Sequence, residues 1–181
     1  MSRIRIPSFE ETPPASQPIL TAAGEQLGFI PNVHRLMALS PAALSGWTDL
    51  MKRLNRTLDL ETRNGIALAV SAVNDCRYCL MAHSSAAMNL AKTAPEEIAL
   101  NKQGRSGDPK RAAAIHFAKT LTEKRGKVSD DDLRLVREAG YTDAQIVEIG
   151  TLAVQFLLTN FMNNIAETDS DFTRGDSPRA G

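Results

Sequence analysis

The sequence has little of several features that mark common protein classes. Among its 181 residues only two are cysteine, and the basic and acidic residues number 21 each, so the formal net charge is zero. A chain without excess positive charge gives no reason to expect nucleic acid or an anionic membrane surface as a partner. No uninterrupted apolar run approaches the ~18 residues that a membrane span needs. The first residues lack the apolar core of a signal peptide, so we expect a cytoplasmic protein.

Strand signals are also missing, because no segment alternates apolar and polar residues over several positions. Apolar residues instead recur at helical spacing, and Ser40, Asp59, Ser129 and Thr142 precede such segments as N-caps. The sequence therefore predicts an all-α fold. The expected helices cover about 19–27, 32–39, 41–55, 60–73, 76–90, 95–101, 109–122, 130–139 and 143–167.

The length suits one domain. Residues 1–18 contain four prolines and are expected to form an extended N-terminal arm. Residues 19–167 then form a single helical domain. The polar residues 168–181, which contain two glycines and a proline, are expected to form a flexible C-terminal tail.

What the chain does have is a concentrated thiol motif. Cys76 and Cys79 are separated by two residues and are followed by His83. On a helix that turns by about 100° per residue these three side chains fall on one face. Cys79 and His83 are i and i+4, which allows proton exchange between thiol and imidazole. The start of a helix stabilises thiolate, and Cys76, nearer that start, is expected to be the more exposed.

Such a pair supports a redox cycle. One thiolate attacks an oxidant to form a sulfenic acid, the second thiol condenses with it to a disulfide, and a dithiol reduces the disulfide again. Three other interpretations compete, and one of them is that His83 only caps or packs. A structural zinc site needs four ligands, and only three ligand side chains converge here; buried inert cysteines are also common. We favour redox chemistry and expect neither a metal nor another cofactor. Tyr78, between the cysteines, either orients and shields the site or is a surface ring.

The motif in its context resembles the AhpD-like alkylhydroperoxidases of the carboxymuconolactone decarboxylase family, most closely the peroxidase-related members. The resemblance covers roughly residues 20–172 and rests on these segments: 28–33, 58–83, 139–143 and 159–164. It implies an AhpD-like multi-helix bundle with the Cys-x-x-Cys motif at a helix N-terminus. It also implies a homo-oligomer, trimer or hexamer, that reduces hydroperoxides with a dithiol or protein-thiol reductant and without haem or flavin.

The resemblance also implies a role for each site residue. Cys79 is the attacking thiol, Cys76 the partner that meets the reductant, and His83 part of a proton relay. The family relay has a Glu twelve residues before the first cysteine, where this chain has Asn64. Asn does not accept a proton, and Glu61 lies one turn earlier, displaced by about 4.5 Å along a helix. Acid–base assistance is worth ~10²–10⁴-fold in rate, so we expect a weak or altered peroxidase.

Three functions follow, in order of preference. The first is a thiol-dependent peroxidase or disulfide oxidoreductase. The second is a redox sensor or helical assembly protein without peroxidase turnover, which the Asn64 position motivates. The third is a decarboxylase-like activity borrowed from the wider family, which is disfavoured because that branch does not use a cysteine pair. Gly65, beside Asn64, is expected to loosen this region, since glycine costs a helix roughly 1 kcal/mol relative to alanine.

Overall fold

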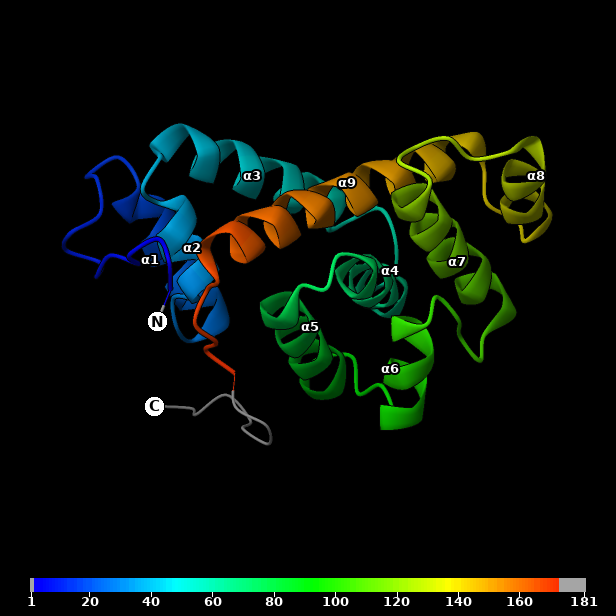
Figure 1. Cartoon of the computed structure of the whole chain (residues 1–181), viewed down its shortest axis with the longest axis horizontal. Helices are drawn as coiled ribbons and strands as arrows, with labels where there is room; N and C mark the ends of the chain where they lie inside the picture. The colour runs from blue at the N-terminus through cyan, green and yellow to red at the C-terminus, as the bar shows by residue number, and fades with distance from the viewer. Residues whose placement is uncertain (1, 173–181) are drawn as a thin grey trace.

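The computed structural model describes residues 2–172, which form helices joined by short loops and contain no strand (Figure 1). The helices are α1 (Gln17–Leu27), α2 (Asn32–Met37), α3 (Pro41–Leu54), α4 (Leu60–Val73), α5 (Arg77–Asn89), α6 (Pro95–Lys102), α7 (Pro109–Glu123), α8 (Asp130–Glu138) and α9 (Asp143–Ala166). The all-α prediction is confirmed.

Helices α3, α4, α8 and α9 begin where the sequence supplies a side-chain cap. Ser40 and Asp59 accept hydrogen bonds from the backbone N–H groups of Ala43 and Thr62. Ser129 and Thr142 form capping boxes with the third residue of α8 and of α9. Each cap satisfies a backbone donor that the helix leaves free, which stabilises the fold by about 1 kcal/mol.

Helix α4 is the centre of the bundle and packs against α5, α6, α7 and α9. Its middle, residues 66–70, is fully buried on every side. The sequence Ile-Ala-Leu-Ala-Val at this position is apolar all round, which is the pattern of a helix surrounded by others. The burial of this helix therefore follows from its sequence.

Gly65 tightens this packing and does not loosen it. A Cβ atom at Gly65 would lie 2.3 Å from Cδ1 of Ile115 on α7 and 2.9 Å from Oδ1 of Asn101 on α6. The missing side chain therefore lets three helices approach one another closely. The helix propensity lost at Gly65 is offset by contacts that a larger residue would prevent.

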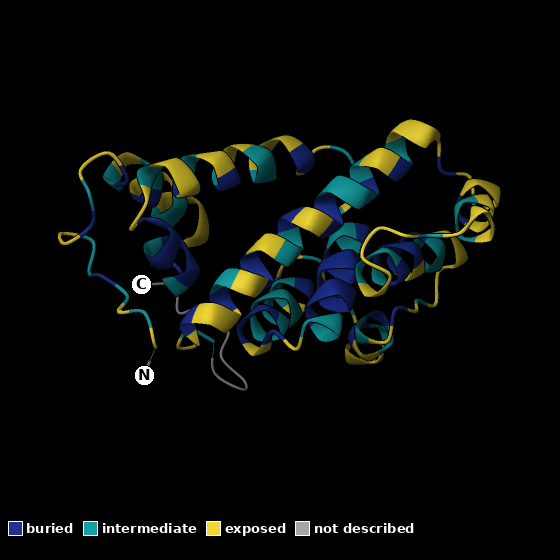
Figure 2. Cartoon of the chain, turned by 45° about the horizontal axis from the view of Figure 1, so that its top comes forward, coloured by how far each residue is buried: buried dark blue, intermediate teal, exposed yellow. Residues whose placement is uncertain are grey.

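Helix α9 crosses the front of the molecule and packs against α3, α4 and α7 (Figures 1 and 2). By length and composition its 24 residues would suffice to span a membrane. Its inner face, however, supplies part of the protein core, and core helices have the same composition. Apolarity alone therefore does not assign α9 to a membrane.

The first and last described segments of the chain lie together at the α1–α2 side of the bundle (Figure 1). The backbone N–H of Arg3 donates to the carbonyl of Ala166 at 2.6 Å, and Ser2 donates to the Asp169 carboxylate. Helix α1 begins two residues before the boundary expected for the N-terminal arm. Residues 168–172, here called the C-terminal strap, run from α9 past the start of α5 (Figure 1). The rest of the predicted tail lies outside the described residues.

Candidate functional site

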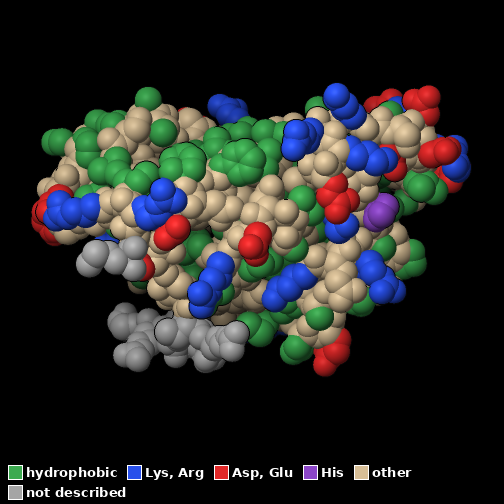
Figure 3. Space-filling model, viewed as in Figure 1, with side chains coloured by type: hydrophobic (Ala, Val, Ile, Leu, Met, Phe, Trp, Pro, Cys, Tyr) green, Lys and Arg blue, Asp and Glu red, His purple; other side chains and the backbone are tan. Residues whose placement is uncertain are grey.

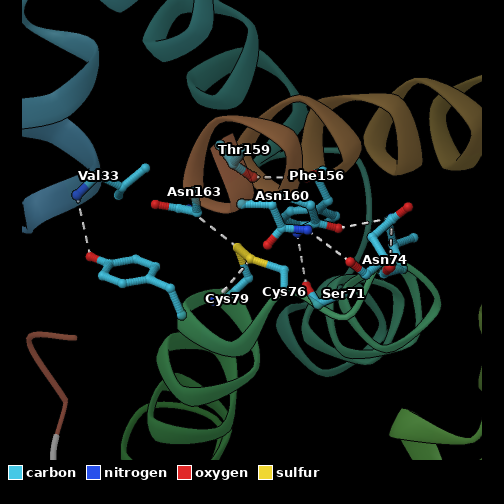
Figure 4. The surroundings of a disulfide bond; sticks show 12 residues. Val33, Ser71, Asn74, Cys76, Cys79, Phe156, Thr159, Asn160 and Asn163 are labelled. Atoms are coloured by element: carbon cyan, nitrogen blue, oxygen red, sulfur yellow. Dashed lines mark hydrogen bonds between the residues drawn. A yellow bond between two sulfur atoms is a disulfide. The ribbon is translucent and has the colours of Figure 1, made fainter. Parts of the chain in front are cut away.

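Cys76 and Cys79 form a disulfide at the start of α5 (Figure 4). The side chain of Cys76 is 0% exposed and that of Cys79 is 3% exposed. Both belong to an apolar cluster with side chains from α1, α2 and α3, among them Leu20, Met37 and Trp47. The expectation that Cys76 is the more exposed thiol is wrong, because neighbouring helices cover the N-terminus of α5.

Cys76 is itself the N-cap of α5. Its backbone is extended, with φ −84° and ψ 92°, and its Sγ accepts a hydrogen bond from the Cys79 N–H at 3.4 Å. Asp75 just before it has φ 49°, in the left-handed region, and turns the chain. The helical-wheel prediction therefore fails for Cys76, which is not helical, and holds for Cys79 and His83. The N–H at the Cys76 sulfur favours its thiolate once the disulfide is reduced.

The second sulfur has a donor from a distant helix. Nδ2 of Asn163 on α9 donates to Sγ of Cys79 at 3.3 Å (Figure 4). The Asn163 side chain is 3% exposed, and its Oδ1 atom is buried with no hydrogen-bond partner in the described part of the chain. Sequence reasoning missed this residue. It treated the segment 159–164 only as support for the resemblance.

A second asparagine ties the loop before Cys76 to α9. Asn160, which is fully buried, donates to Oγ of Ser71 at 3.1 Å and accepts from Nδ2 of Asn74 at 3.0 Å. Asn164 adds a bond from its Nδ2 to the Asn74 carbonyl at 2.8 Å. These bonds fix the turn between α4 and α5, and so the place of the disulfide against α9 (Figure 4).

His83 lies one turn after Cys79, and its ring packs edge-on against Phe156 of α9, with centroids 5.0 Å apart. Burial lowers the pKa of His83 to about 4, because the imidazolium loses hydration there. The imidazole is therefore neutral near pH 7. In residues 2–172 no hydrogen bond joins its side chain to either cysteine. Its role in a proton relay stays a prediction.

The two relay candidates on α4 lie in different surroundings. Asn64 is buried, and its Nδ2 has no hydrogen-bond partner among the residues described. Glu61 lies in the first turn of α4, where its carboxyl interacts with that of Asp59. Within residues 2–172 no hydrogen bond connects Asn64 or Glu61 to His83. A role in a relay stays a prediction for both.

Tyr78 is buried, so the surface-ring interpretation is wrong. Its hydroxyl donates to Oδ2 of Asp171 in the C-terminal strap at 2.5 Å and accepts from the Val33 N–H at 3.4 Å. Burial raises the pKa of Tyr78, and the negative charge of Asp171 raises it further. Phe172 packs edge-on against the same ring, at 5.9 Å between centroids. Tyr78 thereby anchors the strap over the start of α5.

A cavity of about 780 Å³ opens at the start of α5, and neither cysteine is among its lining residues. Asn163 lies in its wall together with Arg77 and Met81 of α5 and with residues of the strap. The cavity thus reaches the amide that contacts the Cys79 sulfur. The described residues contain no group of three or more His, Cys, Asp or Glu side chains arranged to hold a metal ion.

Comparison with known proteins gives a family and a fold. The model of the Carboxymuconolactone decarboxylase family matches residues 41–120, which include both cysteines and His83. A peroxidase-related protein with an alkylhydroperoxidase AhpD core from Ralstonia eutropha JMP134 superimposes with a TM-score of 0.83 at 24% identity, over 94% of this chain and 92% of that one. A peroxidase-related protein from Silicibacter sp. TM1040 gives 0.80 at 24% identity, over 93% and 91%.

A third similar structure carries a different activity in its name. The debrominase Bmp8 superimposes with a TM-score of 0.71 at 18% identity, over 87% of each chain. A cysteine-to-alanine variant of that debrominase has been solved with 2,3,4-tribromopyrrole. No curated protein matches the chain. The chain therefore has the AhpD-like all-α fold, and its residues 41–120 match the model of the carboxymuconolactone decarboxylase family.

Proposed function

We propose that this protein is a thiol-dependent peroxidase, in which Cys79 attacks a hydroperoxide and Cys76 resolves the product. One observation carries the proposal. The only two cysteines of the chain are bonded to each other across the first turn of α5, next to a cavity. Each sulfur accepts one N–H donor, which favours the thiolate that peroxide chemistry needs. The similar peroxidase-related proteins support the same reading.

The cycle balances with two electrons from a dithiol. The Cys79 thiolate attacks the terminal oxygen of the hydroperoxide, the O–O bond breaks, and the alkoxide leaves and takes a proton as an alcohol. The Cys76 thiol then attacks the Cys79 sulfenic acid, and water leaves as the disulfide forms. A dithiol or protein-thiol reductant reduces this disulfide by exchange and is itself oxidised.

Proton transfer is the weak part of this cycle. In this proposal a neutral His83, one turn from Cys79, takes the thiol proton and returns it to the alkoxide. The lowered pKa of His83 makes it a poor base, and Asn64 supplies no carboxylate to raise it. We therefore expect turnover that is slower than the full family relay would allow.

The test is consumption of an organic hydroperoxide by reduced protein with dihydrolipoamide in excess. Turnover should vanish in Cys79→Ser. The matched variant Cys76→Ser should consume one equivalent and stop, because its sulfenic acid has no resolving thiol. Retained turnover in Cys79→Ser would reject the proposal. A single stoichiometric oxidation of the native protein, without turnover, would favour the redox-sensor function instead.

A second candidate is reductive dehalogenation. The cavity beside the disulfide is lined in part by Tyr78, Met81 and Phe172, a surface suited to a flat aromatic ring. The debrominase Bmp8 shares the fold. In this reaction the two thiols supply two electrons and two protons, so that an aryl bromide becomes the arene and hydrogen bromide while the disulfide forms. Bromide release from a bromopyrrole by reduced protein, absent in Cys79→Ser, would support this candidate.

We also propose that a second copy of the chain covers the outer face of α9. Five large apolar side chains of this helix are 39–68% exposed and follow one another at intervals of seven, four, three and four: Val147, Val154, Leu158, Phe161 and Ile165. Figure 3 shows hydrophobic side chains gathered where α3 and α9 lie. This spacing is typical of a helix that packs against another. Phe161→Lys should lower the mass measured by light scattering, and an unchanged mass would contradict the proposal.

A further inference from the structure

The two sulfur atoms of the site receive their hydrogen bonds from different sources. Cys76 accepts the backbone N–H of Cys79, which belongs to the start of α5. That backbone donor is therefore not directed at the Cys79 sulfur. The bond that Cys79 does accept comes from the side chain of Asn163, at 3.3 Å. The thiol that we assign as the attacking one depends on a residue of α9 for this contact.

The surroundings of Asn163 show that this contact is its main polar interaction. A disulfide sulfur carries no proton, so only the N–H end of the amide can bond to it. The other end, Oδ1, is buried and has no partner among the described residues. An amide buried in this way is unfavourable, because one of its polar atoms remains unsatisfied. An apolar residue at position 163 would avoid that penalty, so the fold gives no reason for an amide there.

We propose that Asn163 is a catalytic residue that stabilises the Cys79 thiolate. On reduction the sulfur gains a negative charge, and the amide already lies at bonding distance from it. A hydrogen bond to a charged acceptor is about twice as strong as one between neutral groups. Asn163 thereby lowers the pKa of Cys79, which one turn inside α5 is less well placed than Cys76 to use the helix terminus.

This inference rests on the proposed function only for the assignment of Cys79 as the attacking thiol. It also gives the site a way to form thiolate that does not pass through His83, which has no hydrogen bond to either cysteine in the described structure. Formation of the Cys79 thiolate by this route requires neither Asn64 nor a metal ion. The effect of Asn163 is therefore measurable on the thiol itself, with no substrate present.

The experiment uses Cys76→Ser as background, which leaves Cys79 as the only cysteine of the chain. Serine is a good N-cap, so the start of α5 is retained. The pKa of Cys79 is read from the ultraviolet absorbance of the thiolate as pH rises, corrected with the variant that lacks both thiols. Asn163→Leu should raise that pKa by about one unit, a roughly tenfold loss of thiolate at lower pH.

Two further variants keep the result interpretable. Asn163→Asp has nearly the same size and no N–H to donate, so it should raise the Cys79 pKa at least as far, and it serves if the Leu variant does not fold. Gln155→Leu is the matched control: Gln155 is another buried amide of α9 whose oxygen lacks a partner among the described residues, but no hydrogen bond joins it to a cysteine there, so the Cys79 pKa should stay unchanged.

An unchanged Cys79 pKa in a folded Asn163→Leu or Asn163→Asp protein, judged by circular dichroism, would overturn the inference. A raised pKa in a protein that consumes no hydroperoxide would support the role of Asn163 and reject the peroxidase proposal. The two failures are thus distinguished, because one is read from thiol titration and the other from turnover.

Discussion

The two halves of α9 bury very different side chains. The first half places Ile146, Ile149, Leu152 and Ala153 in an apolar cluster with α4, α7 and α8. The second half buries only polar side chains before its last residue: Gln155, Thr159, Asn160 and Asn163. The same helix, with the same periodicity, thus fills a core at one end and holds a disulfide at the other.

This difference separates what stabilises the fold from what acts on the thiols. In the first half, any side chain of the right volume and apolarity satisfies the position. In the second half, burial of an amide is unfavourable unless its atoms are bonded. Asn160 has bonds at both ends, whereas Asn163 and Gln155 each keep an oxygen without a partner in the described chain. Residues that act on the thiols are therefore expected in the polar half of α9.

The largest effect on stability should come from the apolar half. Ile149→Ala removes a fully buried side chain next to α4 and α7 and should lower the free energy of unfolding by about 2–5 kcal/mol. Urea denaturation measures this change. The Cys79 pKa in the Cys76→Ser background should not move. A shift of the Cys79 pKa would show that the two halves are coupled through the helix.

Acid should act on the region around the thiols through its neutral histidines. Burial lowers the pKa of His34, packed 4.7 Å from the Trp47 ring, from 6.5 to about 4. The unfolded chain binds this proton first as pH falls, so stability is full above about pH 6.5 and declines toward pH 4. For a fully buried histidine the loss is at most on the order of 3 kcal/mol.

Urea denaturation at several pH values checks this, with His34→Phe and His116→Gln compared. The His34 variant should show a flatter dependence between pH 6.5 and 4. His116 is exposed on α7, and its substitution serves as the matched control. Equal slopes in the native protein and the His34 variant would contradict the prediction.

Whether a feature of the fold or of the site could be predicted from the sequence depends on whether its cause lies within a few residues of it. The helix starts at Ser40, Asp59 and Thr142 were predicted because a cap acts within three residues of itself. The burial of α4 follows from an apolar sequence on all sides. The burial of Cys76 was not predicted, since it depends on an apolar cluster that residues of α1, α2 and α3 form with the start of α5.

The donor to Cys79 was also beyond sequence reasoning. Asn163 lies 84 positions after Cys79, and no local pattern tells which asparagine of α9 faces a sulfur. The one available signal was the polarity of residues 159, 160 and 163. These residues fall on the inner side of a helix whose earlier inner positions are apolar. Buried polar residues in such positions indicate a site.

An intermediate effect should follow from breaking the Asn160 contacts. Asn160→Leu removes the donor to the Ser71 hydroxyl and one of the two acceptors of the Asn74 amide, which keeps its bond to the Val70 carbonyl. This should cost about 1–3 kcal/mol in urea denaturation. The double variant Asn160→Leu with Ser71→Ala removes one of the two groups that lose a partner and should recover part of this loss. Equal stability of the single and double variants would show that the Ser71 bond contributes nothing.

Tyr78→Phe should have the smallest effect on stability and the clearest effect on the access of a reductant to the disulfide. The change removes the hydroxyl that bonds Asp171 and keeps the ring against Phe172, so the loss should be about 1 kcal/mol or less. Asp171 still accepts from the Asn32 N–H, so the strap is loosened and not released. Because the strap borders the cavity beside the disulfide, reduction by a small dithiol should become faster.

Tyr141→Phe, which removes a hydroxyl in the apolar region, should leave the reduction rate unchanged. Equal rates in both variants would mean that the strap does not limit access, and that burial of the thiols in their apolar cluster does.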